Sequence, residues 1–188
     1  MKINSFRVTQ VFLASMLITT IAWAQPNGIV PGQRIGKITV HEEGKKVTEA
    51  LGETNDGDAA MGHYWEYWKK DGQETDVYSV RDGDGSHTYV RQIRITSPWF
   101  HTSSGIGSGS SLRSIRHSYP GTKWVAYYLS DNKARVDLYD NQARGITFEV
   151  LRNNDNRAAG RCIAVVVHPK RLGVLEEYAH RFDYLPVN

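Results

Sequence analysis

Strict alternation between apolar and polar residues is the clearest pattern in the chain. Within residues 88–96, Ile93 and Ile95 fall on one side and Gln92 and Arg94 on the other, which is the two-residue period of a β-strand. Asp-Gly and Asp-Asn pairs punctuate runs of similar composition and mark tight turns between them. The pattern predicts seven strands, over residues 63–70, 75–81, 88–96, 123–129, 134–139, 145–151 and 161–167.

Three shorter segments have helical spacing instead. Apolar residues recur at intervals of three or four, and Gly or Pro-Gly follows the first two segments as a stop signal. The predicted helices cover residues 45–51, 112–119 and, after Pro169, an amphipathic final segment over Leu172–Phe182. Residues 28–36 are rich in Gly and Pro and predict a loop, and residues 53–62 predict a polar turn region.

The order of these elements predicts an internal repeat: loop, helix and strands occur twice before the final helix. Shifting the first half by 68 positions superposes three apolar pairs, Ile38 with Ile106, Val47 with Ile115, and Leu51 with Tyr119. We therefore predict an α+β protein with a first helix–sheet repeat at 25–104 and a second at 105–188, the second including the C-terminal helix. The strands should form a curved antiparallel sheet with the helices on one face.

Aromatic residues gather in two of the predicted strands, HYWEYWKK (63–70) and KWVAYYL (123–129), which we take to be equivalent. Strand side chains alternate in direction, so Tyr127 and Leu129 are expected to face the helices, together with Val136 and Leu138. The opposite, open face would then carry a set of binding candidates, namely Trp65, Tyr67, Trp124, Tyr128, Arg135 and Tyr139. Tyr, Trp and Arg are enriched at binding hot spots, although cross-strand aromatic pairs also stabilise ordinary sheets, and both interpretations stay open at this point.

The N-terminus has the features of an export signal. Lys2 and Arg7 precede an apolar run from Val11 to Ile21, and Ala22-Trp23-Ala24 has the small-x-small pattern of a cleavage site. This segment holds two of the 23 basic residues and no acid, so 21 basic and 20 acidic residues follow it, with a net charge near +1. We predict cleavage after Ala24 and a periplasmic or secreted protein without integral membrane association. The near-neutral charge argues against a nucleic-acid partner.

Several motifs that suggest chemistry have simpler interpretations. GIGSGSS (105–111) lacks dinucleotide-site spacing and the Gly-Lys-Ser/Thr of a phosphate loop, so we expect a bend before a helix capped by Ser110 or Ser111. DGDGSH (82–87) has too few acids for a calcium loop and predicts a tight turn. Cys162 lies in a run typical of a buried strand, so it predicts a core residue. Seven histidines form no metal-ligand spacing, and we predict no metal, cofactor or catalytic residue.

Three stretches carry a resemblance to a known family: IVPGQRIGKI (29–38), ALG (50–52) and SPWFHTSSGIGSGSSL (97–112). Together they resemble the tandem helix–sheet repeat of β-lactamase inhibitor protein-like domains, and more distantly the same unit in small outer-membrane assembly lipoproteins. The resemblance covers about residues 28–168. It implies two α/β repeats whose concave antiparallel sheet binds a protein partner, and it implies no catalysis.

The sequence thus predicts an exported, non-enzymatic binding protein that recognises an envelope or secreted protein through an aromatic sheet face. Two alternatives stay open: a hydrolase acting on a cell-envelope substrate, and a structural envelope component. A hydrolase would need a cleft where His, Ser or acidic side chains converge.

Overall fold

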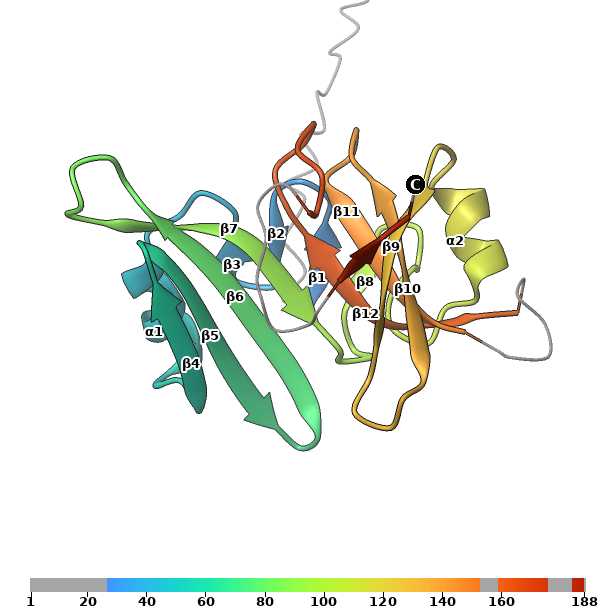
Figure 1. Cartoon of the computed structure of the whole chain (residues 1–188), viewed down its shortest axis with the longest axis horizontal. Helices are drawn as coiled ribbons and strands as arrows, with labels where there is room; N and C mark the ends of the chain where they lie inside the picture. The colour runs from blue at the N-terminus through green and yellow to red at the C-terminus, as the bar shows by residue number, and fades with distance from the viewer. Residues whose placement is uncertain (1–26, 153–158, 176–183, 188) are drawn as a thin grey trace, which may run out of the picture.

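The structure, a computed structural model, describes residues 27–152, 159–175 and 184–187 (Figure 1). The predicted signal segment, residues 1–24, lies outside the described residues. So does most of the predicted final helix, Leu172–Phe182, of which residues 172–175 are described and contain no helix.

The described residues form two β-sheets, a large one and a small one. The large sheet has nine strands, and every neighbouring pair is antiparallel. In spatial order they are β13 (Leu185–Pro186), β9 (Lys123–Leu129), β10 (Arg135–Asn141), β11 (Ile146–Leu151), β12 (Arg161–Val167), β7 (Thr88–Ile95), β6 (Gln73–Arg81), β5 (His63–Lys70) and β4 (Asp56–Ala60). With two short helices, this confirms the predicted α+β class and the curved antiparallel sheet.

The strand order shows that the large sheet consists of two four-stranded meanders joined at their last strands. Strands β4 to β7 form one wing in Figure 1 and β9 to β12 form the other, with β7 paired to β12. At the join Arg94 pairs with Val166. The equivalent strands of the two wings are therefore β4 and β9, β5 and β10, β6 and β11, and β7 and β12. The predicted equivalence of residues 63–70 with 123–129 is wrong, because β9 corresponds to β4.

The two helices, α1 (Gly44–Leu51) and α2 (Leu112–Ser118), pack into one hydrophobic core on the same side of the large sheet. Val47 and Ile115 are both fully buried there, as their superposition in the repeat requires. The third superposed pair differs, because Tyr119 is buried and Leu51 is exposed. Ser111 caps α2 by accepting a hydrogen bond from the Ser114 backbone N–H, 3.1 Å.

The predicted N-terminal loop contains strands of a second, smaller sheet, and the loop prediction is wrong there. Its order is β3 (Ile38–Thr39), β2 (Arg34–Ile35), β1 (Gly28–Val30) and β8 (His101–Thr102), with β1 and β8 parallel. These strands have two or three residues each, too few to show a period. The small sheet meets the large one where Gly32 N–H bonds Gly145 O, 3.0 Å. A Cβ on Gly145 would lie 2.8 Å from Gly32 Cα, so this approach requires glycine.

The large sheet has a core on each face. The first lies between the sheet and a layer made of α1, α2 and the small sheet. The second lies on the opposite face of the β9–β12 wing, where Val136, Leu138 and Tyr128 pack against Val174 and Tyr184 of the C-terminal segment. Within the described ranges, no helix has the length and apolarity needed to cross a membrane.

Candidate functional site

The six predicted binding residues separate into three places. Trp65 and Tyr67 lie on the sheet face opposite the helices, because they pair across strands with Tyr78 and with Asp76, whose side chain bonds Arg94 on that face. Tyr128 lies on that same face of the other wing. Trp124, Arg135 and Tyr139 instead share the helix face with Phe148.

A one-residue error in the register of β9 against β10 explains the wrong face assignments. Tyr128 pairs directly with Val136 and Tyr127 with Asp137, and directly paired residues share a face. The register then shifts between Leu138 and Tyr139, so Trp124 pairs with Tyr139. The prediction that Trp124, Arg135 and Tyr139 share a face is confirmed, but the prediction that this face lies opposite the helices is wrong.

Burial removes two of the six residues from any exposed surface. Tyr128 is 2% exposed and Tyr139 is 6% exposed. Tyr139 packs under α2, with the Arg116 guanidinium 5.3 Å from its ring centre. Burial, and then the nearby negative charge of Asp137, raises the pKa of Tyr139. Both tyrosines therefore contribute to the cores, and their predicted exposure was wrong.

The remaining candidates on the helix face form one exposed group at the edge of the β9–β12 wing. We call Trp124, Tyr127, Leu129 and Arg135 the β9 surface. Trp124 is 39% exposed and Leu129 is 54% exposed. The Arg135 guanidinium lies 3.8 Å from the Tyr127 ring centre and 5.1 Å from that of Trp124, which is the geometry of a cation–π contact to each ring.

A hydrogen bond to Asp137 holds this arginine in place against the two rings. Arg135 Nε donates to Asp137 Oδ1, 2.7 Å, and Arg152 lies 3.9 Å from the other oxygen of Asp137. Asp137 itself is buried. Arg135 Nη2 is buried, and no acceptor among the described residues bonds it.

The β9 surface is surrounded by positive charge. Arg116 on α2 is exposed and lies over the Tyr139 ring, and Arg135 and Arg152 both contact Asp137 on the same face of β10. Asp137 is the acid in contact with these cations in the described chain, and two of them already share it. The surface therefore combines exposed aromatic area with a positive local field.

Sequence reasoning missed Tyr127 and Leu129, which it assigned to the core. The signal was present in the hairpin between β9 and β10. Ser130 N–H bonds Ala134 O, 2.9 Å, and this closed turn sets Leu129 opposite Arg135. Pairing residues from that turn along the two strands would have placed Tyr127 on the same face as Arg135 and Asp137.

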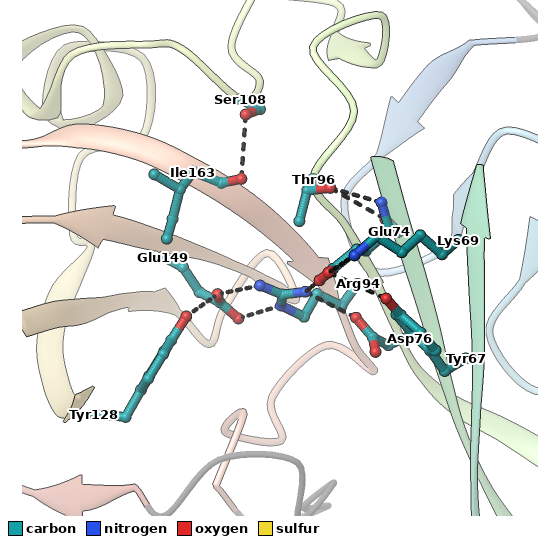
Figure 2. A network of polar contacts seen from close by, with 10 residues as sticks. All are labelled: Tyr67, Lys69, Glu74, Asp76, Arg94, Thr96, Ser108, Tyr128, Glu149 and Ile163. Carbon is teal, nitrogen blue, oxygen red and sulfur yellow. Dashed lines mark hydrogen bonds and ion pairs between the residues drawn. The ribbon is translucent and has the colours of Figure 1, made fainter. Parts of the chain in front are cut away.

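Tyr128 belongs to a buried polar network that joins the two wings (Figure 2). Arg94 on β7 donates from Nε and Nη2 to both oxygens of Glu149 on β11, at 2.8 Å each, and from Nη1 to Asp76 on β6, also 2.8 Å. Tyr128 O–H donates to Glu149 Oε2, 2.8 Å. Burial opposes the charge of Arg94, but the carboxylates of Glu149 and Asp76 raise its pKa well above the ordinary value.

The outer part of this network is formed by β5 and β6. Glu74 lies 3.5 Å from Arg94 and 3.8 Å from Lys69, and it accepts a hydrogen bond from Tyr67 O–H, 3.2 Å. The Tyr67 ring stacks on Trp65 with centres 5.8 Å apart. Each carboxylate of the network has a cation as its partner, which is the condition for burying charged groups.

A hydroxyl, an imidazole and a carboxylate also converge in the second wing. His168 Nε2 and Thr147 Oγ1 lie 3.1 and 3.0 Å from Asp140 Oδ1, and Thr147 Oγ1 lies 3.1 Å from His168 Nε2. All three residues are buried, and Asp140 Oδ2 accepts from Val174 N–H, 3.4 Å. The group fastens the segment after β12 to the sheet, and Gln92 Nε2 does the same by donating to Val174 O, 2.8 Å.

Other predicted motifs have the local structures expected of them. Cys162 is buried in the core, and burial raises the pKa of its thiol, as expected of an inert core cysteine. Residues 82–87 form the turn between β6 and β7, with Ser86 Oγ bonding Asp84, 2.6 Å. Among the described residues, no group of three or more His, Cys, Asp or Glu side chains is placed to hold a metal ion.

Comparison with known proteins gives distant structural similarities alone. No protein-family model and no curated protein sequence matches the chain. It is similar to the crystal structure of the uncharacterized protein YfeY from Escherichia coli, with a TM-score of 0.42 and 11% identity over 74% of this chain and 98% of that one. It is also similar to a DUF4309 family protein, YjgB, from Bacillus subtilis, with a TM-score of 0.43 and 11% identity over 74% and 88%.

Proposed function

We propose that the protein is an exported, non-enzymatic binding protein that recognises a protein partner through the β9 surface. The observation that supports this most directly is Arg135 held against the exposed rings of Trp124 and Tyr127. Trp, Tyr and Arg are the residues that most often dominate binding energy at interfaces. The neighbouring Arg116 and Arg152 favour a partner whose contacting patch is acidic, because opposite charges steer association.

The rigid placement of these side chains also favours binding. Trp124 Nε1 donates to Ala126 O, 3.0 Å, and Arg135 is fixed by Asp137. Side chains that are already ordered lose less conformational entropy when a partner binds. Export rests on the N-terminal sequence pattern, and the absence of catalysis rests on the resemblance stated above.

The test is a comparison of captured proteins from an extracytoplasmic extract of the native organism. Residues 25–188 serve as bait beside the Trp124→Ala/Tyr127→Ala double variant and the Trp99→Ala variant, which removes an exposed tryptophan outside the β9 surface. We expect a partner captured by the unchanged bait and by Trp99→Ala, lost with the double variant, and weakened as salt concentration rises. Equal capture by all three folded baits would contradict the proposed surface.

A further inference from the structure

A hollow of about 420 Å³ lies at the far end of the large sheet from the β9 surface, between the start of α1, strand β5 and the β6–β7 turn. Its volume is in the range of ligand pockets, about 300–1,000 Å³. Its lining includes two acidic and two basic side chains, Glu43, Glu66, Lys45 and Arg81, together with Tyr64 and His87.

Most of the charged groups that line this hollow already have partners. Glu43 lies 2.7 Å from Lys45 and 3.6 Å from His87. The hydrogen bond to Lys45 is the main reason that the pKa of Glu43 is lowered. Arg81 donates to Tyr64 O–H and holds its guanidinium 5.3 Å from the Tyr64 ring centre.

Glu66 is the exception among them. It lies in the middle of β5, and its cross-strand neighbours are Gly57 and Val77, which have no polar side-chain atoms. Desolvation by burial raises its pKa. Within the described part of the chain, the Glu66 carboxylate has neither a hydrogen-bond donor nor an ion-pair partner. An unpaired, partly desolvated carboxylate destabilises a fold, so its presence in the lining of a hollow requires an explanation.

We propose that this hollow binds a cationic group on a flexible stem, a primary ammonium or guanidinium as in a lysine or arginine side chain, with Glu66 as its counter-ion. Binding would supply Glu66 with a partner in direct contact, because Lys45 contacts Glu43 and Arg81 contacts Tyr64, and partial desolvation strengthens the attraction. Thr48 and Thr88 also line the hollow and can accept hydrogen bonds from the bound cation. The Tyr64 ring offers apolar area for the stem.

Two other ligand classes fit the hollow less well. A metal ion needs several converging ligands, and Glu66 is a lone carboxylate because Glu43 is taken by Lys45 and His87. An anion would meet the negative charge of Glu66, while Arg81 is already directed at Tyr64. This site is independent of the β9 surface, so either proposal can fail without the other.

The test measures binding of two probes, Nα-acetyl-lysinamide and Nα-acetyl-argininamide, to residues 25–188 by calorimetry and NMR. Nα-acetyl-norleucinamide is the matched neutral probe, since it has the lysine stem without the charge. The protein variants are Glu66→Gln, which removes the charge and keeps the shape, and Glu53→Gln, which makes the same change at an exposed residue that does not line the hollow.

We expect saturable binding of a cationic probe to the unchanged protein and to Glu53→Gln, with NMR shifts at Tyr64 and Thr48. Affinity should fall at least about ten-fold in Glu66→Gln, and the neutral probe should not bind saturably. Glu66→Gln should keep its fold, checked by circular dichroism, because it removes an unpaired charge. Equal affinity in both variants, or no saturable binding of either cation, would overturn the proposal.

A further probe separates the two sources of such a cation. The peptide acetyl-Gly-Ser-Lys-Ser-Gly-amide presents the same side chain within a polypeptide. Tighter binding of the peptide than of Nα-acetyl-lysinamide, lost in Glu66→Gln, would support a protein side chain as the ligand. Equal affinities, both lost in Glu66→Gln, would support a small cationic molecule.

Discussion

The two wings of the large sheet have the same strand order but different chemistry on the face opposite the helices. Strand pairing places equivalent residues of the two wings in one row across the sheet. From one edge to the other, that row reads Asp56, Tyr67, Asp76, Arg94, Val166, Thr147, Asp140 and Lys123. The arginine of the first wing has a valine as its counterpart, and the tyrosine has an aspartate.

This difference determines how each wing is completed. In the second wing Val136, Leu138 and Val166 form a core with the C-terminal segment. The first wing places Arg94 at the join, where it crosses to Glu149 of the second. The two wings are therefore joined by a contact that has no counterpart in the other direction, because Val166 stands in the second wing where the first has Arg94.

Glu149→Ala should lower the free energy of unfolding most, because it removes the link between the two wings. Glu149→Ala leaves the buried Arg94 without its two-bond partner, and such a loss typically lowers the free energy of unfolding by about 3–5 kcal/mol. Asp76→Ala should have a smaller effect, because Arg94 then keeps both bonds to Glu149. Urea unfolding of both variants checks the order, and an equal or larger loss in Asp76→Ala would contradict the assigned role of Glu149.

Neighbouring tyrosines on β9 should respond differently to loss of one hydroxyl. Tyr128→Phe removes a buried hydrogen bond to the Glu149 carboxylate, which is worth about 1.5–3 kcal/mol for a charged acceptor. Tyr127→Phe should change stability by less than about 0.5 kcal/mol, because that ring lies at the surface. Equal effects in thermal and urea unfolding would mean that the face assignment of β9 is wrong.

The two sides of the large sheet avoid pairing with another chain in different ways, and this can be tested at the edge strand β4. Strand β9 is covered by β13, whereas on β4 the carboxylates of Asp56 and Asp58 accept the backbone N–H groups of Gly57 and Ala59, 2.8 Å each. Charged residues at an edge strand hinder pairing with another chain. Asp56→Ala/Asp58→Ala should change stability by less than about 0.5 kcal/mol but increase self-association in sedimentation velocity.

The smallest expected effect is the pH dependence contributed by Glu66. Its pKa is raised in the folded protein, so its contribution favours the folded state below the unfolded pKa, near 4.5. That contribution is lost as pH rises through the folded pKa. The stability of Glu66→Gln relative to the unchanged protein should therefore increase over this range. A difference that is constant with pH, measured by urea unfolding at pH 4 to 7, would contradict the raised pKa.

Much of the element order could be predicted because it depends on local pattern. The predicted bounds of β5, β9 and β12 match the structure, and those of α1 and α2 differ by one residue. Strand β4 was predicted as a turn region because its residues, DGDAA, are all exposed. The 68-residue shift nevertheless superposes residues 56–60 on 124–128, within β9, so the repeat contained a signal for this strand.

The candidate site was predicted in part, for a physical reason. Trp124 and Arg135 were identified from composition and lie together on an exposed surface. Their face was wrong because β10 is buried on both sides, and alternation shows which side chains share a face but not which face meets the helices. The apolar face of Val136 and Leu138 does form a core, but it packs against the C-terminal segment and not against the helices.

The sequence alone determined the seven longer strands, the two described helices and the residue types available for binding, because these depend on neighbours within a few positions. The tertiary structure alone decided which residues meet. The register shift between Leu138 and Tyr139 returned Trp124 to the face of Arg135, and the C-terminal segment covered Tyr128. Both depend on contacts between segments far apart in the chain, where a one-residue change in pairing moves every side chain of a strand to the other face.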